Sequence, residues 1–565
     1  MSRNRHLWIL AAIIAGGAAV RFATLGHQSY DHDETVTVLR VLHPSFVTTM
    51  KAVDHLERTP PLYYALAWFW SRLFGTAEVG LRSLSAIFGV LTAPAAYLAA
   101  RELVSRRAGL IAAAFVAFNP YLIWYSQEAR AYALFALFAA WALYFFARAL
   151  RDSSGRALAL WATASVLALC SYYFAVFLII PEGILLVRSF RPRSRAFAAV
   201  AANGAVGLAL VPLAVAQEHG GHLDLFTSRP LIDRAGQALL DFVASVEPQP
   251  FTGTTAVDMV QVLTGAGIGL IFAWGLVNVA RRGLPIERRA AIRVGFIAAA
   301  SFGLPLALAA AGFDFVEPRK VLIGSVVPLL VLGSIGLGSL EARKVGLAGA
   351  MAGAAIFAGV LVAVYVSGQM QRINWRGAAN EIGQASQSRV LVVPSSGQVP
   401  LAYYLHAKDF RPSTRPREIR VAAIDTLGIR YAADKPAPRF RLVRLERVAG
   451  SFWLRRYRAP APRLITAQAV SGGRVLDEPS LNLFNRVPRP TYAGRRPLGA
   501  PRPGGRPGAR GSPDGGATRR RAPRAGTAAR GCSPRSTRRR SPGARPAARR
   551  AGSSTRRPSA ATGPA

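Results

Sequence analysis

The sequence predicts an all-α protein that crosses a membrane many times, followed by a small α/β domain and a disordered basic tail. Of its 565 residues, 51% are hydrophobic and only 18% are charged, against about 25% charged residues in an ordinary soluble domain. Apolar runs separated by short arginine-bearing loops fill residues 7–367. Mixed sequence fills residues 368–486, and residues 487–565 are almost entirely Arg, Pro, Gly, Ala, Ser and Thr.

Eleven apolar runs are candidates for membrane-spanning helices, since a helix needs roughly 20 residues to cross a bilayer. We expect these spans at 7–24, 80–100, 108–124, 131–149, 157–172, 174–190, 197–216, 259–280, 291–312, 321–340 and 346–367. The stretch 157–190 alone fits either one long kinked helix or two short helices. The first run is expected to be a signal anchor, because no small-residue cleavage site follows it and more spans do.

Arginine and lysine residues in alternate loops predict the orientation, because cytoplasmic loops carry an excess of both. Arg156 and Arg188 both lie in such basic loops, so two crossings must separate them and 157–190 becomes two spans. The odd total places the amino terminus in the cytoplasm and everything after residue 367 outside it. We therefore expect a multi-pass protein of the cytoplasmic membrane with an extracytoplasmic carboxyl domain.

The carboxyl domain, residues 368–486, is expected to be small and α/β. A helix is predicted at 377–387, and four alternating stretches are predicted to be strands: RVLVVPSS, PLAYYLHA, FRLVRLERV and SFWLRRYR. Contact with an acceptor is one role for this domain, but a structural cap is favoured by about two to one.

The basic tail explains much of the net charge of +41. From Arg486 to Ala565 it contains 21 Arg and one Asp and so supplies +20; the folded part is therefore not expected to bind nucleic acid. Such a composition cannot build a core and predicts disorder. One hypothesis is a polybasic arm that binds anionic envelope polymers or lipid headgroups; we favour a shifted reading frame in GC-rich DNA, because the tail begins abruptly. Cys170 and Cys532 provide neither a disulfide framework nor metal-ligand spacing.

The outer loop 25–79 carries the densest acidic cluster, in the segment SYDHDETVTVLR, with Asp31, Asp33 and Glu34 around His32. The same loop continues into ERTPPLYYALAWFWSRLFG, where the Pro pair can start a helix. The aromatic helix expected from Leu62 to Phe74 is either an interfacial anchor or part of a site, with about even odds.

Later segments of the predicted outer face bring cations towards these acids: Arg82 with Glu78, Arg130 with Glu128, and Arg319 with Lys320. Each set fits a solvated ion pair or a charge that faces a cavity. Arginine binds phosphate through two parallel hydrogen bonds, and a carboxylate can deprotonate an acceptor. Together they suggest a site for a phosphate-bearing lipid substrate. The chain has neither a GxGxxG segment before a helix nor a P-loop, which favours a lipid-linked donor over a nucleotide sugar.

Five segments, in order, resemble the membrane glycosyltransferases of the GT-C fold: SYDHDETVTVLR, TPPLYYALAWFWSRLFGTAEVGLRSLSAIFG, NPYLIWYSQEARAYAL, VEPRKVLIGSVVPLL and INWRGAA. More narrowly, they resemble the family 39 and protein-mannosyltransferase-like group, which includes aminoarabinose and galacturonic acid transferases of bacterial envelopes. The resemblance covers about residues 5–410. It implies an inverting enzyme that moves a sugar, with mannose as the first choice, from a polyprenyl-phosphate carrier to a protein, lipid or glycan acceptor.

The resemblance implies that Asp33 is the general base and that Glu34 is the second choice or a helper. Candidates for binding the donor phosphate are Arg82, Arg130, Arg319 and Lys320. Expected lining residues are Arg58, Pro60, Pro61, Tyr63, Tyr64, Glu78, Glu128 and Tyr132. Asp31 and His32 could help to bind a divalent cation, although one His beside acids is weak evidence for a metal, and no other cofactor is expected.

Two positions depart from the family pattern. Thr59 stands where the aminoarabinose branch has Lys before the Pro pair, with Arg58 one residue earlier, which fits a neutral sugar better. Lys320 follows Arg319 where many relatives have Tyr, so a cation is kept and an aromatic contact is lost.

The rival functions are a transporter or lipid-linked sugar flippase and a non-catalytic scaffold. A transporter should show internal repeats and charged or broken helices near the bilayer midplane. In this sequence the ionisable residues gather at the outer ends of the spans, and no convincing repeat is visible. A scaffold would give the acids of loop 25–79 no particular role.

Overall fold

The computed structural model describes residues 3–217, 229–244, 255–383, 389–394, 397–409, 415–424, 439–448, 452–465 and 480–485. All of them belong to one compact unit, Met1–Thr491. Helices account for nearly all of its regular structure up to residue 382, and a small mixed sheet follows. The predicted tail 487–565, with its two interpretations, lies outside the described residues.

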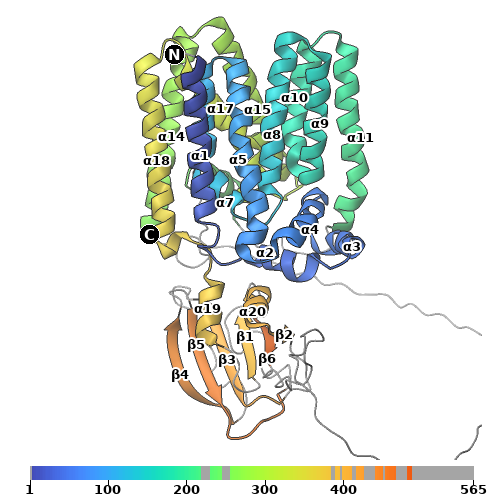
Figure 1. The fold of residues 1–565 in the computed structure, drawn as a ribbon, viewed down its shortest axis with the longest axis vertical. Coiled ribbons are helices and arrows are strands. Elements are labelled where there is room, and N and C mark those ends of the chain that lie inside the picture. The colour runs from blue at the N-terminus through green and yellow to red at the C-terminus, as the bar shows by residue number, and fades with distance from the viewer. Residues whose placement is uncertain are drawn as a thin grey trace, which may run out of the picture. The chain divides into compact units, whose positions relative to one another are not determined.

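Long helices lie side by side with roughly aligned axes and form a bundle (Figure 1). Their bounds are α1 (Arg3–Ala23), α5 (Glu78–Leu103), α8 (Tyr132–Asp152), α9 (Gly155–Ser171), α10 (Val176–Ser189), α11 (Arg193–Gln217), α14 (Thr255–Arg282), α15 (Pro285–Ala310), α17 (Val326–Gly338) and α18 (Arg343–Val366). Shorter pieces connect or flank them: η2 (Tyr173–Ala175), α13 (Leu231–Asp241), α16 (Pro318–Val321), η3 (Leu322–Ser325) and η4 (Gly368–Met370).

One predicted span is bent in the middle. Helix α6 (Arg106–Phe118) meets α7 (Pro120–Ser126) at 55°. Asn119 stops the first helix and caps the second, because its side chain accepts a 2.9 Å hydrogen bond from the backbone N–H of Leu122. Pro120 then occupies the first helical position, where its missing N–H costs nothing.

The structure confirms a multi-pass helical membrane protein but not a count of eleven spans. Within the described ranges, eight helices are long and apolar enough to cross a bilayer, and the bent pair raises this to nine. Each of the eleven predicted runs coincides with a helix or a broken helix. However, α9 has only 17 residues and α10 only 14, fewer than the roughly 20 of a typical crossing. The predicted orientation stays a prediction.

The central helices α5 and α8 pack against each other, and their buried residues include many alanines. Ala96 and Ala100 on α5 and Ala140 and Ala147 on α8 are buried in the same core cluster. Lipid tails are as apolar as the helices themselves, so small residues stabilise such contacts by letting the backbones approach closely.

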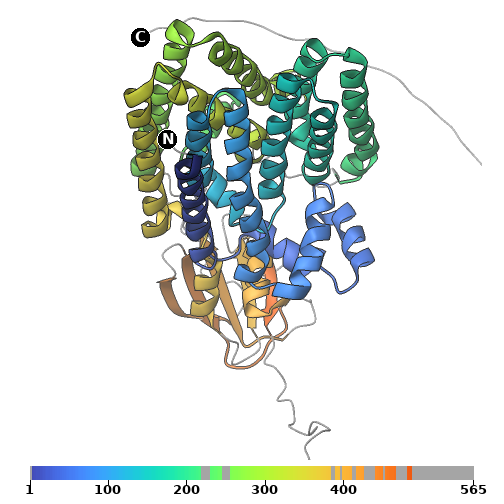
Figure 2. The same ribbon diagram turned by 45° about the horizontal axis from the view of Figure 1, so that its top comes forward.

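The loop 25–79 folds into short helices at one end of the bundle (Figures 1 and 2). They are α2 (His32–Val36), the π-helical turn η1 (Thr37–Val41), α3 (Phe46–Leu56) and α4 (Leu62–Phe74). The helix predicted at 62–74 is confirmed with the same bounds. It ends at Gly75, whose φ of +75° suits glycine.

The carboxyl domain contains a six-stranded sheet in the order β2-β6-β1-β3-β5-β4. Strands β1 and β3 are parallel, and the other neighbours are antiparallel. The bounds are β1 (Arg389–Pro394), β2 (Lys408–Asp409), β3 (Glu418–Ile424), β4 (Arg441–Val448), β5 (Phe452–Arg458) and β6 (Ser480–Asn485). Three of the predicted strand segments correspond to β1, β4 and β5.

The strand predicted for PLAYYLHA is wrong, because this segment lies in the helix α20 (Gln398–Leu405). Leu401 and Leu405, four residues apart, are both buried against the sheet with α19 (Trp375–Ile382). The helical period, and not the alternation of a strand, therefore places the apolar side chains of this segment in the core.

Candidate active site

The acidic motif lies at the start of helix α2, where neighbouring carboxylates face different environments. The chain is extended at Asp31 and turns helical at His32. The side chain of Glu34 is fully buried, whereas that of Asp33 is 32% exposed. One helical step thus separates a closed position from an accessible one.

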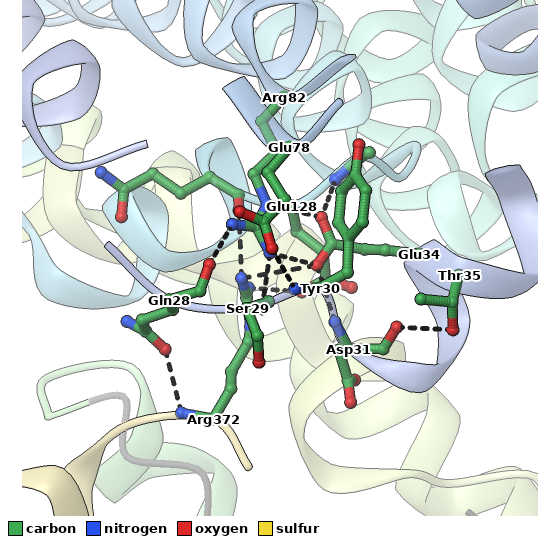
Figure 3. Close-up of polar contacts among 12 residues, drawn as sticks. Gln28, Ser29, Tyr30, Asp31, Glu34, Thr35, Glu78, Arg82, Glu128 and Arg372 are labelled. Atoms are coloured by element: carbon green, nitrogen blue, oxygen red, sulfur yellow. Dashed lines mark hydrogen bonds and ion pairs between the residues drawn. The ribbon is translucent and has the colours of Figure 1, made fainter. Parts of the chain in front are cut away.

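Glu34 and Arg82 form a buried pair with two parallel contacts (Figure 3). The Nε of Arg82 donates to Oε1 of Glu34 at 2.8 Å, and Nη2 donates to Oε2 at 2.5 Å. The remaining Arg82 donors reach the carbonyl oxygens of Leu25, Gln28 and Ser29 at 2.7–3.0 Å. All five N–H groups of the guanidinium are therefore used inside the protein.

Glu34 is equally well satisfied. Besides Arg82, its carboxylate accepts hydrogen bonds from the backbone N–H groups of Ala129, at 2.9 Å, and Asp31, at 3.1 Å. Burial would raise the pKa of Glu34, but Arg82, Arg372 and the backbone N–H of Ala129 together hold the pKa below its usual range. Glu34 is thus an ionised link between loop 25–79 and the turn before α8.

Asp33 faces Lys320, whose Nζ lies 3.2 Å from its Oδ2. Lys320 also lies 3.0 Å from Glu317, and its side chain is 29% exposed. The charge of Lys320 holds the pKa of Asp33 well below its usual range, against the opposing effect of partial burial, with Arg130 and His32 acting in the same direction. Asp33 is therefore an ionised and accessible carboxylate at neutral pH.

Arg130 is held by Glu57, a residue that the sequence analysis did not select. Its Nη1 contacts both carboxylate oxygens of Glu57, at 2.8 and 2.6 Å, and Oγ1 of Thr37 at 3.3 Å. Its guanidinium also lies 5.8 Å from the ring centre of Tyr64. This buried pair joins the end of α3 to the start of α8.

Arg372 is a second site residue that the sequence analysis missed. Its backbone N–H donates to Oε1 of Gln28 at 2.9 Å (Figure 3), and its Nη2 lies 3.0 Å from Oε2 of Glu128. Nη1 lies 3.7 Å from Glu34, and the guanidinium stacks 4.6 Å from the ring centre of Trp124. The available signal was its place directly before the motif INWRGAA.

Burial of Glu128 raises the pKa of its carboxyl to about 7, although Arg372 opposes this rise. A carboxyl that titrates near neutral pH can change its charge under working conditions. Glu128 is therefore a second titratable acid near the motif.

Spacing alone suggested an ion pair between Glu78 and its helical neighbour Arg82, but Glu78 has other partners. Its carboxylate contacts Arg376, the hydroxyl of Tyr404 and, at 3.2 Å, the backbone N–H of Tyr30. Residues just beyond the bundle thus hold the chain directly before the acidic motif.

Arg319, the residue before Lys320, contacts residues of α7 and α13. Its Nε is 3.9 Å from Oδ2 of the buried Asp241, and its guanidinium is 5.1 Å from the ring centre of Trp124. Its backbone carbonyl accepts hydrogen bonds from Tyr121 and, at 3.4 Å, from Tyr125. Burial raises the pKa of Asp241 to about 6 despite Arg319. The sequence analysis did not select Asp241.

The remaining predicted lining residues are mostly packed away. Tyr63 and Tyr64 are buried, and their hydroxyls bond to Ser85, at 3.1 Å, and Thr59, at 3.2 Å. The other positions are Pro60 and Tyr132, which are buried, Pro61, which is half-buried, and Arg58, which is exposed. Asp31 and His32 are partly buried; within the described ranges, no group of three or more His, Cys, Asp or Glu side chains could hold a metal ion.

The chain is thus a helical membrane bundle with an accessible carboxylate, Asp33, beside a lysine at one end. Residues 58–216 match the model of the family described as dolichyl-phosphate-mannose-protein mannosyltransferase. This match confirms the resemblance to the protein-mannosyltransferase-like group of GT-C glycosyltransferases. No curated protein sequence shows a significant match to the chain.

Three solved structures match much of the chain at low sequence identity. ArnT from Cupriavidus metallidurans in the apo state has a TM-score of 0.49 and 13% identity, over 80% of this chain and 97% of that chain. The archaeal oligosaccharyltransferase AglB from Archaeoglobus fulgidus has a TM-score of 0.42 and 14% identity, over 66% and 57%. The arabinofuranosyltransferase AftD from Mycobacteria has a TM-score of 0.41 and 15% identity, over 82% and 42%.

Proposed function

We propose that this protein transfers a sugar from a polyprenyl-phosphate carrier to an acceptor, with inversion, on the outer face of the cytoplasmic membrane. The observation that carries the proposal is the accessible Asp33 carboxylate 3.2 Å from the Lys320 ammonium, a base beside a cation for a phosphate. The family match supports a donor of this chemical type, because the description of the family names a mannose linked to a lipid phosphate. Mannose is the first sugar to test, with a protein, lipid or glycan as acceptor.

The reaction needs one base and a stabilised leaving group. Asp33 takes the proton from the acceptor hydroxyl or amine, and the acceptor atom attacks the anomeric carbon. The bond from that carbon to the phosphate oxygen breaks, and its electron pair leaves with the polyprenyl phosphate. The phosphate charge changes from about −1 to −2, so fixed cations stabilise the transition state more than the bound donor.

The contacts rank the four predicted phosphate ligands. Arg82 already uses all five of its donors within the protein, and Arg130 is bound to the buried Glu57. Lys320 is partly exposed and lies directly beside the base, with Arg319 as its neighbour in the chain. We therefore assign the donor phosphate to Lys320 and Arg319, and the support of the loop to Arg82 and Arg130.

A transfer assay tests this function. Membranes that contain the protein receive radiolabelled polyprenyl-phosphate mannose, and the products are separated into protein, lipid and glycan fractions. We expect label in one fraction with the wild type, and background with Asp33→Asn. Lys51→Gln is the control, because it neutralises an exposed charged residue in α3 of the same loop.

Two results would overturn the proposal. Full transfer by Asp33→Asn, Glu34→Gln and the double variant would remove the enzymatic role of this motif. Movement of the lipid-linked sugar across the membrane without any product would instead support a flippase. Other polyprenyl-phosphate sugars are the next donors to test if mannose gives no product.

A further inference from the structure

In the proposed function, Lys320 both contacts the base Asp33 and binds the donor phosphate. The inference drawn from this double role rests on that proposed function. We propose that Lys320 is the counter-ion of Asp33 only while the donor site is empty, and that the donor phosphate draws Lys320 away and releases the base. Donor binding would then precede acceptor activation.

The first argument is that three neighbouring arginines are already paired with other carboxylates. Arg82, Arg130 and Arg372 are buried, and each is paired with a buried carboxylate, respectively Glu34, Glu57 and Glu128. Separating any of these pairs would leave a buried charge without its partner, which is strongly unfavourable. A phosphate that enters the site would therefore have to break one of these buried pairs in order to bind its arginine.

The second argument is that the pair of Lys320 and Asp33 can separate at low cost. Both side chains are about one third exposed, so water can solvate either partner when they part. Lysine is a compact charge on a flexible four-carbon stem, so its ammonium can turn without backbone movement. Glu317, three residues earlier and 3.0 Å from Nζ, can keep the ammonium in the site as it turns.

The charges around Asp33 set its strength as a base. Cationic neighbours are Lys320 and Arg130, with His32 acting in the same direction; acidic neighbours are Asp31 and Glu57. Arg130 is bound to Glu57, so Lys320 is the cation whose departure changes the field at Asp33 most. Without it, the two acidic neighbours raise the proton affinity of Asp33, which makes it a stronger base.

The cycle closes without another reactant. Donor binding moves Lys320 to the phosphate, Asp33 receives the acceptor proton, and polyprenyl phosphate leaves with the electron pair of the broken C–O bond. Asp33 then releases its proton to water, and Lys320 returns when the carrier departs. The empty enzyme therefore holds its base in an ion pair.

The inference predicts that Asp33 and the phosphate compete for Lys320. We would measure the affinity of undecaprenyl phosphate for the purified full chain in nanodiscs, with inorganic phosphate and undecaprenol as separate probes. We expect Asp33→Asn to bind undecaprenyl phosphate about 5- to 10-fold more tightly than the wild type. This gain should disappear in the Lys320→Gln background, where there is no ammonium to compete for.

Asp31→Asn is the matched control, because it removes one negative charge from the same motif. The cation that acts most strongly on Asp31 is Arg372, so we expect less than a twofold change. General repulsion of the phosphate would instead give similar gains for both Asn variants, and would keep the gain in the Lys320→Gln background.

The outcomes separate the two proposals. Wild type that does not bind undecaprenyl phosphate contradicts the proposed carrier and, with it, the competition. Binding by the wild type without a gain in Asp33→Asn, or with the same gain after Lys320→Gln, overturns the competition alone. Equal binding of inorganic phosphate would show that the site recognises the phosphate group and not the lipid.

Discussion

Two ion pairs made by adjacent residues of one motif differ in almost every physical respect. Glu34 and Arg82 are fully buried, joined by two contacts, and satisfied by further backbone hydrogen bonds. Asp33 and Lys320 are about one third exposed and joined by one contact at 3.2 Å. The comparison shows that charge at a predicted site does not identify chemistry, because a saturated pair supports the fold while an open pair can meet a substrate.

The largest expected effect is on the open pair, Asp33 and Lys320. Asp33→Asn keeps the shape of the side chain but cannot accept a proton, so we expect the turnover number to fall by about 10³-fold. The unfolding midpoint should stay close to that of the wild type, since the residue is partly exposed. Transfer kinetics and thermal unfolding of the same preparation check both statements; loss of activity together with loss of folding would contradict the comparison.

In the closed pair, Glu34 and Arg82, a substitution should lower stability first. Glu34→Gln leaves Arg82 buried without a counter-charge, and we expect a loss of about 3–5 kcal/mol in the free energy of unfolding. Denaturant unfolding of the purified protein measures this loss. Glu381→Gln, at an exposed position of α19, is the control. Equal stability of both variants would show that the buried pair does not support the fold.

Arg372 connects the closed pair to Glu128, and a moderate effect is expected there. Arg372→Gln should lower the turnover number by about 10- to 100-fold, because the loops that carry the acids lose a common support. It should also raise the pKa of Glu128 above about 7, since Arg372 opposes the effect of burial. Infrared titration of the carboxyl band that Glu128→Gln removes would show this shift.

Arg376→Gln serves as the comparison for Arg372, because Arg376 contacts Glu78 and not Glu128. It should leave the midpoint of that carboxyl band in place. An unchanged midpoint in Arg372→Gln would mean that the guanidinium does not act on Glu128.

The smallest effect concerns the acid side of the pH profile. The pKa of Asp33 is depressed by Lys320 in the free protein, so the base stays ionised as the pH falls below about 4. Lys320→Gln should raise this pKa, and kcat/KM for the donor should then decline at a higher pH. A decline at the same pH in both proteins would contradict the assigned role of Lys320.

Much of the architecture follows from local sequence. Each predicted apolar run coincides with a helix, and the Pro pair at Pro60 starts α4 at the predicted residue, Leu62, because hydrophobic length and proline geometry act over a few residues. Local sequence gave the wrong structure for PLAYYLHA, because a short apolar run fits a strand as well as a helix. Packing against the sheet made this segment helical.

The pairing of charges was a different problem. Spacing placed Glu78 beside Arg82, yet Arg82 binds Glu34 and Glu78 binds Arg376, almost 300 residues away. Glu57, Asp241 and Arg372 carried no local signal of their partners, because a surface arginine and a buried one look alike in sequence.

The sequence by itself determined a helical membrane protein, the position of its acidic motif and the family to which the motifs point. Only the tertiary structure decided which carboxylate is closed and which is open. The physical reason is that burial makes an unsatisfied charge costly, so distant loops must supply each buried acid with a full set of donors. Asp33, whose side chain is 32% exposed, is the carboxylate that we propose as the base.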